Sequence, residues 1–404
     1  MIRKSDLEVV ISMQKEQLAR VNNEIQRDIL LSLPEETGNH ALIISGVRRC
    51  GKSTLIKQMI NREAYKAFFI NFDTPKLYNF DINDFEILDS VIAESNPQKL
   101  YFDEIQVVEG WELYVRQKLD EGFQVIVTGS NASLLSRELG TKLTGRHITK
   151  ELYPFSYNEF IKLKGLEPNN ESFNIYFQSG GFPEFLKRDN PEILTSLFDD
   201  VLFRDIAVRH GIRDIKSLQR LLLYLTANVG SPVTATRLTT VLGIKSTATI
   251  LDFFSYFEQS WLLGLLPKFS WSYRAQMVNP RKAYILDNGL VNAVSPSFTD
   301  NDGRKLENLI YWHLRQKQKT VFYFNETGRE CDFVVLKNNK AEQVIQVCYS
   351  LEYGNRQREE NGLLAAMDFF NIDYGIIITM NQSDEIQVNN KHISVMPAFL
   401  FVSQ

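Results

Sequence analysis

The sequence predicts an α/β fold class, and three observations support this prediction. Short apolar runs recur along the first third of the chain and again near its end. Stretches of helical periodicity separate these runs, an alternation typical of βαβ units with helices on both faces of a parallel sheet. The length of 404 residues exceeds what one core supports and indicates about two to three domains.

Changes in pattern along the chain divide it into five expected segments. A helical lead-in comes first, and the alternation of strands and helices follows it. A mostly helical stretch, broken by the turn GGFP, leads into a helical region that ends in strands, and a small α/β region closes the chain. The expected segments are 1–33, 34–165, 166–213, 214–300 and 301–404.

Composition argues against several classes of protein. Hydrophobic residues make up 44% and charged residues 23% of the chain, as in an ordinary globular protein. The net charge of −4 argues against a protein covered in nucleic acid, although it leaves a local basic patch open. No apolar run approaches the roughly 20 residues that a membrane-spanning helix needs.

The cysteines and the start of the chain indicate the compartment. Cys50, Cys331 and Cys348 have no regular spacing, so they form no disulfide framework and fit a reducing environment. The start MIRKSDLEVVISMQKEQ is interrupted by charges and lacks the apolar core of a secretory signal. We therefore expect a cytoplasmic protein with no membrane segment.

The second segment carries the pattern of the parallel sheet in detail. Its strands are expected at 41–45, 67–72, 100–104, 123–130 and 147–152, with helices at 52–61 and around 109–121. The strands are short and apolar on both faces, which indicates that helices cover the sheet on both sides.

The stretch GVRRCGKST, residues 46–54, lies between the first expected strand and the first expected helix. It matches G-x-x-x-x-G-K-[ST], in which glycines let the backbone curl so that successive N–H groups point at phosphate oxygens. Lys52 would reach the β- and γ-phosphates and Ser53 would bind Mg²⁺, while the helix dipole adds positive potential. The expected ATP-binding residues here are Gly46, Val47, Arg48, Arg49, Cys50, Gly51, Lys52, Ser53 and Thr54.

The stretch KLYFDEIQ supplies a second part of this predicted P-loop site. Its apolar residues lead into Asp103 and Glu104 at the carboxyl end of a strand, where ligands bind in open α/β sheets. Asp103 is expected to hold the Mg²⁺ ion and Glu104 to polarise the attacking water. Because Glu104 could serve as a general base, we expect the nucleotide to be hydrolysed and not merely stored.

Polar and basic residues after the next strand complete the expected site. Ser130 or Asn131, in TGSNAS, could contact the γ-phosphate, although capping of the loop is nearly as good an interpretation. Arg137 and Arg146 follow. One of them could act in trans as an arginine finger in an oligomer, with Arg146 as the preferred candidate, although a solvated surface position is the better interpretation for any single arginine.

The helical region after residue 214 has the order of a winged helix. Helices are expected at 217–230, 234–243 and 246–260, followed by a hairpin at 261–271. The third helix has four aromatic residues and one lysine at its head, so we expect it to pack rather than read DNA. A set of basic residues could contact phosphates or pair with nucleotide across a subunit interface, although simple solvation is the default interpretation. Its members are Arg204, Arg209, His210, Arg213, Lys216 and Arg220.

The chain resembles a prokaryotic family of AAA+-type ATP-binding proteins whose C-terminal domain, of unknown function, is related to PD-(D/E)xK nucleases. The resemblance rests on GVRRCGKST, LYFDEIQ, VTGSNASLLS, LTGRHITKELYPFSYNEF, FRDI, and GRECDFVV followed by VIQVCYS. It implies ATP binding and hydrolysis, an AAA-like core with a helical lid and winged helix, and a nuclease-like tail.

The tail departs from the nuclease pattern at two positions. Such nucleases use a helix glutamate, an aspartate at a strand start, and acid-x-lysine on the next strand, so that carboxylates hold Mg²⁺ and a lysine assists water. Glu307, Glu330 and Asp332 fit the first pieces, but Gln346 and Cys348 replace the last pair. A thiol is a poor ligand for a hard cation, so we expect an inactive tail in which a weak metal site stays open.

The predicted function is Mg²⁺-dependent hydrolysis of ATP to ADP, coupled to movement of the winged helix and the degenerate nuclease-like tail. Two alternatives stay open: an ATP-dependent DNA nuclease or DNA-processing ATPase, and a slow-turnover regulatory switch. A DNA or protein partner and a homo-oligomer also stay open.

Overall fold

The computed structural model describes residues 2–20, 24–62, 66–130, 143, 145–296, 301–317 and 319–404. The chain divides into two compact units, residues 1–153 and 154–404. This division places residues 154–165 in the second unit, whereas the sequence pattern grouped them with the first. Across the part of the chain that the structure describes, every helix is too short or too polar to span a bilayer.

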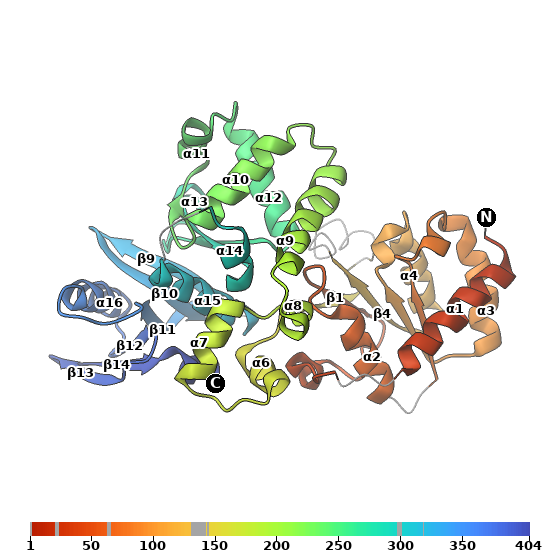
Figure 1. Cartoon of the computed structure of the whole chain (residues 1–404), viewed down its shortest axis with the longest axis horizontal. Helices are drawn as coiled ribbons and strands as arrows, with labels where there is room; N and C mark the ends of the chain where they lie inside the picture. The colour runs from red at the N-terminus through yellow and green to blue at the C-terminus, as the bar shows by residue number, and fades with distance from the viewer. Residues whose placement is uncertain are drawn as a thin grey trace. The chain divides into compact units, whose positions relative to one another are not determined.

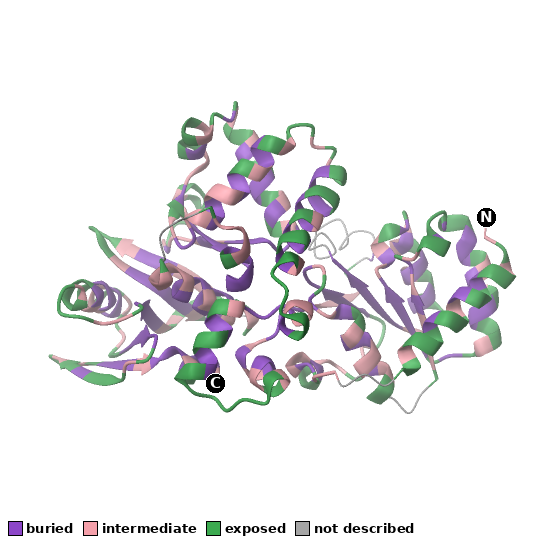
Figure 2. Ribbon diagram, viewed as in Figure 1, coloured by how far each residue is buried: buried purple, intermediate pink, exposed green. Residues whose placement is uncertain are grey.

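The first unit is built on five parallel strands in the order β2-β3-β4-β1-β5 (Figure 1). The strands are β1 (Ala41–Ser45), β2 (Ala67–Asn71), β3 (Lys99–Asp103), β4 (Gln124–Gly129) and β5 (His147–Glu151). Every residue of β1 and β3 is buried, and Figure 2 shows these strands inside the unit. Strands buried on both faces are typical of a parallel sheet covered by helices, and the predicted α/β fold class is confirmed.

Helices on both sides of this sheet complete the first unit. They are α1 (Lys4–Ala19), α2 (Lys52–Arg62), α3 (Phe85–Ser95) and α4 (Trp111–Asp120), with short 3₁₀ turns Asp28–Ser32, Pro75–Leu77, Ile82–Asp84 and Ile105–Val107. Helix α1 packs against β2 and α3, and its Leu7 and Val10 belong to the core. The expected helical lead-in is therefore part of this unit.

A side chain of α1 also caps an edge strand. The Gln14 amide donates to the Asn71 carbonyl at 2.9 Å and accepts from the Asn71 N–H at 2.8 Å. Strand β2 lies at the edge of the sheet, where backbone groups lack a neighbouring strand. Gln14 thus satisfies both backbone groups of the last residue of β2, beside the carboxyl end of β3.

The second unit begins with helices and a small antiparallel sheet. The helices are α6 (Tyr157–Lys164), α7 (Asn170–Ser179), α8 (Pro183–Arg188), α9 (Glu192–Asp199) with its π-helical continuation Asp200–Val208, α10 (Ile215–Ala227), α11 (Ala235–Leu242), α12 (Thr247–Gln259), α13 (Tyr273–Val278) and α14 (Asn288–Val294). The sheet has the order β6-β8-β7, with β6 (Pro232–Val233), β7 (Leu263–Pro267) and β8 (Arg281–Ile285).

The prediction of a hairpin within residues 261–271 is wrong, because the strand in this segment pairs with a strand outside it. Strand β7 lies in this segment, but it pairs antiparallel with β8, and α13 lies between the two strands in sequence. The segment contains one strand, because Phe269 and Trp271 pack together with Phe369 instead of forming a second strand. Helix α12 packs as expected, with Phe253, Phe254 and Phe257 buried.

A six-stranded mixed sheet closes the second unit, in the order β13-β14-β12-β11-β10-β9. Strands β9, β10 and β11 are antiparallel, and α16 leads to β12, which runs parallel to β11. Helix α16 packs on β10 and β11, and a final helix packs on β14. The elements are α15 (Asp302–Gln316), β9 (Thr320–Glu326), β10 (Arg329–Lys337), β11 (Lys340–Val347), α16 (Arg356–Phe370), β12 (Tyr374–Thr379), β13 (Asp384–Val388), β14 (Lys391–Pro397) and α17 (Ala398–Val402).

Candidate nucleotide-binding site

The loop between β1 and α2 is curled by its glycines. A Cβ atom on Gly46 would lie 2.0 Å from the Leu152 carbonyl oxygen, so only glycine fits there. Gly51 has a φ of +100°, and Arg49 also adopts a left-handed conformation, with a φ of 62°. Such a sequence of conformations turns successive N–H groups toward one concave side, as in a phosphate-binding nest.

A buried arginine holds this loop from behind. Arg27, only 3% exposed, donates from Nη1 to the Cys50 carbonyl oxygen and from Nη2 to the Tyr153 carbonyl oxygen, both at 2.7 Å. Its backbone N–H donates to Gln58 Oε1 on α2 at 3.0 Å. Arg27 therefore ties the loop to the chain after β5, and sequence reasoning missed it.

Lys52 begins α2, and its ammonium group lies inside the loop. Nζ donates to the carbonyl oxygens of Gly46 at 3.1 Å and Val47 at 3.2 Å, and it lies 3.3 Å from Glu104 Oε1. Burial opposes the charge on Lys52, but Glu104, Cys50 and Asp103 together outweigh burial and raise the pKa of the ammonium. The loop thus contains a fixed positive charge at the amino end of a helix, where the helix dipole also favours an anion.

Asp103 ends β3 and is the centre of a hydrogen-bond network. Its Oδ2 accepts from Ser53 Oγ and from Asn71 Nδ2, each at 2.7 Å, and its Oδ1 accepts from the Thr128 hydroxyl. Burial and the nearby Glu104 raise the pKa of Asp103, while the hydroxyl donors oppose this change. Parallel strands bring these side chains together, because β2, β3 and β4 end at the same edge of the sheet.

Glu104 follows β3 in a left-handed conformation, with φ 52° and ψ 36°. Its backbone N–H donates to Thr128 Oγ1 at 3.1 Å, and its carboxylate accepts from the Gln106 amide. Burial favours the neutral acid, but the Lys52 ammonium beside it holds the pKa of Glu104 below its usual range. Glu104 is thus ionised at neutral pH and able to accept a proton.

Hard oxygen donors stand next to the lysine. Ser53 Oγ and Asp103 Oδ2 lie 2.7 Å apart at the start of α2. Mg²⁺ is usually held by one or two carboxylates and hydroxyls together with phosphate oxygens, and these two residues fit that requirement. Among the described residues, no group of three or more His, Cys, Asp and Glu side chains is arranged to hold a metal ion.

The other predicted residues of the site differ in their placement. Arg48 lies 4.0 Å from Asp73, and the Cys50 thiol is buried, which raises its pKa. Val47 is also buried, and Thr54 belongs to the first turn of α2. Asn131 and Arg137 lie outside the described residues.

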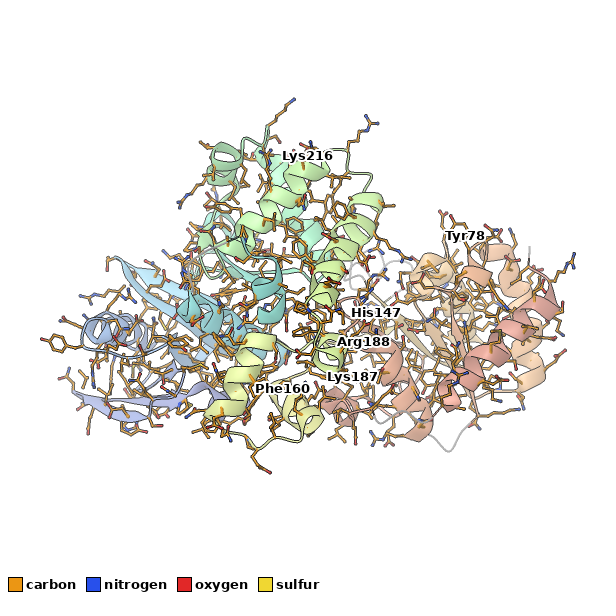
Figure 3. All side chains as sticks on the ribbon, in the orientation of Figure 1. Tyr78, His147, Phe160, Lys187, Arg188 and Lys216 are labelled. Atoms are coloured by element: carbon orange, nitrogen blue, oxygen red, sulfur yellow. The ribbon has the colours of Figure 1, made fainter. Side chains whose placement is uncertain are left out.

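Arg146 lies at the amino ends of the parallel strands, whereas the loop lies at the carboxyl end of β1. Arg146 precedes His147, which begins β5 and is labelled in Figure 3. His147 pairs with Ala41 at the start of β1, whereas the loop follows the end of β1. The Arg146 guanidinium donates to Asp120 Oδ1 at 2.7 Å. Within one chain, the sheet therefore separates Arg146 from Lys52.

Sequence reasoning also missed Asn71 and Thr128. Each carries a short polar side chain at the carboxyl end of an apolar strand, and each donates a hydrogen bond to Asp103. A short polar residue at the end of an apolar strand could have indicated both residues, because the carboxyl ends of parallel strands lie on the same side of a sheet. Nothing in the sequence near Arg27 indicated its role.

The chain matches two family models. Residues 38–161 match the model described as "AAA domain", and residues 170–301 match "Domain of unknown function (DUF8612)". An uncharacterized protein of Methanocaldococcus jannaschii is 32% identical over 428 residues, which cover 98% of this chain and 95% of that protein. The chain belongs to the same family as this archaeal protein. Its AAA domain, an AAA-type P-loop ATPase domain, covers residues 38–161, most of which belong to the first unit.

A second relative and two solved structures are also similar. An uncharacterized protein of Haemophilus influenzae is 29% identical over 369 residues, covering 86% of this chain and 90% of that protein. A signal transduction ATPase with numerous domains from Pyrococcus horikoshii aligns with a TM-score of 0.29 and 13% identity, covering 74% of this chain and 46% of that one. The Aeropyrum pernix ORC1 protein in complex with DNA aligns with a TM-score of 0.27 and 12% identity, covering 71% and 91%. Scores this low do not establish a common fold.

Proposed function

We propose that this protein hydrolyses ATP to ADP and phosphate in its AAA domain, with Mg²⁺ as cofactor. One observation carries the proposal. Lys52 and Ser53 on the loop meet Asp103 and Glu104 from the end of β3, with Ser53 2.7 Å from Asp103 and Lys52 3.3 Å from Glu104. A phosphate-binding cation, two oxygen donors and an ionised base are thus adjacent.

This geometry supports a proposed role for each residue. The N–H groups of residues 46–51 and the Lys52 ammonium would bind the β- and γ-phosphates. Ser53 and Asp103 would hold Mg²⁺, which supplies positive charge against the phosphates when bound. Glu104 would orient the attacking water and accept its proton, and its lowered pKa keeps it ionised for this step.

The first experiment measures ATP turnover in Glu104→Gln. The amide keeps the size of the side chain but cannot accept a proton, so turnover should fall by about 100-fold or more while ATP binding is kept. The matched control is Glu109→Gln, because Glu109 is exposed and lies in the same segment. Unchanged turnover in Glu104→Gln would contradict the proposal.

Arg146 remains our proposed arginine finger. Its position at the opposite edge of the sheet means that it could serve only the site of another subunit in a homo-oligomer. Asn131 is proposed as a γ-phosphate contact. Both assignments follow from the sequence pattern.

We propose that residues 214–300 include a winged helix. In support, the order α10, β6, α11, α12, β7, α13, β8 places three helices before β7 and β8, which pair antiparallel. The proposed role is movement during the ATP cycle rather than reading of DNA, because α12 packs with its aromatic residues. Lys216, labelled in Figure 3, is an exposed member of the basic set near α10.

We propose that residues 301–404 are nuclease-like but do not cut DNA. The order of α15, β9, β10, β11, α16 and β12 supports the likeness. At the two departing positions, the Gln346 amide donates to Glu359 Oε2 at 2.6 Å and the Cys348 thiol is buried. Neither offers the carboxylate and ammonium of the nuclease pattern.

A further inference from the structure

A buried lysine stands among three carboxylates in the second unit. Lys282 is 1% exposed, and its Nζ lies 2.8 Å from Glu307 Oε1, 2.8 Å from Glu330 Oε1 and 2.8 Å from Asp332 Oδ1. An ammonium group has three protons, so three acceptors use all of them. We call Glu307, Glu330 and Asp332 the carboxylate cluster.

Other donors complete the surroundings of the cluster. The Tyr284 hydroxyl donates to Glu307 Oε1 at 2.6 Å, the Asn325 amide to Glu330 Oε2 at 2.9 Å, and the Val347 N–H to Asp332 Oδ2 at 2.9 Å. Each carboxylate thus has Lys282 and at least one further partner. A buried charge with such a complete set of partners is far less costly than an isolated one.

The contributing elements are distant in sequence. Lys282 belongs to β8 of the three-stranded sheet, Glu307 to α15, and Glu330 and Asp332 to β10 of the six-stranded sheet. The ammonium group therefore joins two sheets of the second unit. Burial and the Asp332 carboxylate raise the pKa of Glu307 to about 7, although Lys282 opposes this change.

The three oxygen atoms surround the Lys282 ammonium, and with this group in place no set of such side chains among the described residues is arranged to hold a metal ion. Oxygen ligands lie about 2.3–2.6 Å from Ca²⁺, slightly closer than the 2.8 Å that separates these atoms from Nζ. An ammonium and a divalent cation cannot share this position. Three carboxylates without Lys282 would form a strongly negative site suited to a hard cation.

We propose that Lys282 is an internal counter-ion that takes the position of a divalent cation in the carboxylate cluster and fastens β8 to the six-stranded sheet. The cluster of the natural protein then binds no divalent cation. Removal of the ammonium converts the cluster into a cation site. This inference does not depend on ATP hydrolysis, so it stands or falls separately from the proposed function.

The experiment measures Mn²⁺ binding by calorimetry in the full-length protein without nucleotide. Lys282→Met removes the charge but keeps much of the apolar volume, and we expect it to bind one Mn²⁺ at least about tenfold more tightly than the natural protein does. Addition of Asp332→Asn should abolish the gain. The control Lys340→Met, at an exposed position of β11, should leave Mn²⁺ binding unchanged.

Two results would overturn the inference. One is a Mn²⁺ site in the natural protein that Asp332→Asn removes, because Lys282 would then not occupy the position. The other is folded Lys282→Met that gains no site. If Lys282→Met does not fold, refolding in the presence of Mn²⁺ decides: recovery of native circular dichroism supports the inference, and failure to recover it contradicts the inference.

Discussion

At the scale of single residues, the nucleotide-binding loop depends on a side chain that approaches it from behind. Arg27 donates to the carbonyl oxygens of Cys50 and Tyr153, and a Cβ on Gly51 would lie 3.2 Å from Arg27 Nη1. The guanidinium therefore fixes the path of the backbone whose N–H groups would face the phosphates. Its effect on the nucleotide is indirect, through the position of the loop.

Replacement of Arg27 tests this role. Arg27→Met leaves the two carbonyl oxygens without their charged donor, and hydrogen bonds to charged groups contribute about 1.5–3 kcal/mol each. We expect the free energy of unfolding of the first unit to fall by about 3 kcal/mol and ATP affinity to fall by about tenfold. Urea denaturation and ATP titration measure these quantities.

The control for this prediction is Arg20→Met, at an exposed position shortly after α1. It should change neither quantity appreciably. If Arg27→Met kept both the stability and the ATP affinity of the natural protein, the assignment of Arg27 as a support for the loop would be wrong.

The sequence pointed to single residues of the candidate site only where a local motif contained them. Lys52, Ser53, Asp103 and Glu104 were identified from GKST and from FDE, and the structure brings them together. Arg27 and Lys282 were not identified, because their partners are far away in sequence: Cys50 and Tyr153 for one, the carboxylate cluster for the other. No local pattern distinguishes such residues from surface cations.

At the scale of elements, alternation of apolar runs predicted the parallel strands, because strands buried on both faces are uniformly apolar. Pairing between strands was less predictable. The expected hairpin at 261–271 failed because β7 pairs with β8 across α13. Its local sequence gave no sign of this partner. Strands β13 and β14 were not predicted, and in β13 exposed charged residues interrupt the apolar pattern.

Helix α15 carries a histidine that makes stability depend on pH. Burial lowers the pKa of His313 to about 4, and the Lys317 ammonium acts in the same direction. The folded state thus resists protonation that the unfolded state accepts near pH 6.5. The contribution of His313 to stability is present above pH 6.5 and is lost as pH falls toward 4.

Lowering the pH from 7.5 to 5 should decrease the free energy of unfolding of the second unit in the natural protein. We expect this decrease to exceed that in His313→Gln by about 1–2 kcal/mol. The midpoint of urea unfolding, followed by tryptophan fluorescence in both proteins, measures the difference. Equal pH dependence in the two proteins would show that His313 titrates normally in the folded state.

At the scale of the whole molecule, the two units differ in architecture. The first unit has most of the AAA domain, and the second joins a proposed winged helix to the six-stranded sheet. The order of segments expected from the sequence stays a prediction, which rests on motif and periodicity changing together along the chain. The sequence could not predict that the boundary between the units lies at residues 153 and 154, since no break in composition marks that point.

The central claim is that the loop at 46–54 binds ATP through Lys52. Calorimetric titration of the full-length protein with Mg²⁺ and ATP tests it most directly, with Lys52→Ala compared with Lys66→Ala, which alters an exposed lysine. We predict saturable binding by the natural protein and by Lys66→Ala, and affinity at least about 100-fold weaker in Lys52→Ala, because the loop loses its buried cation. Absence of binding by the natural protein, or equal affinity in Lys52→Ala, would contradict the claim.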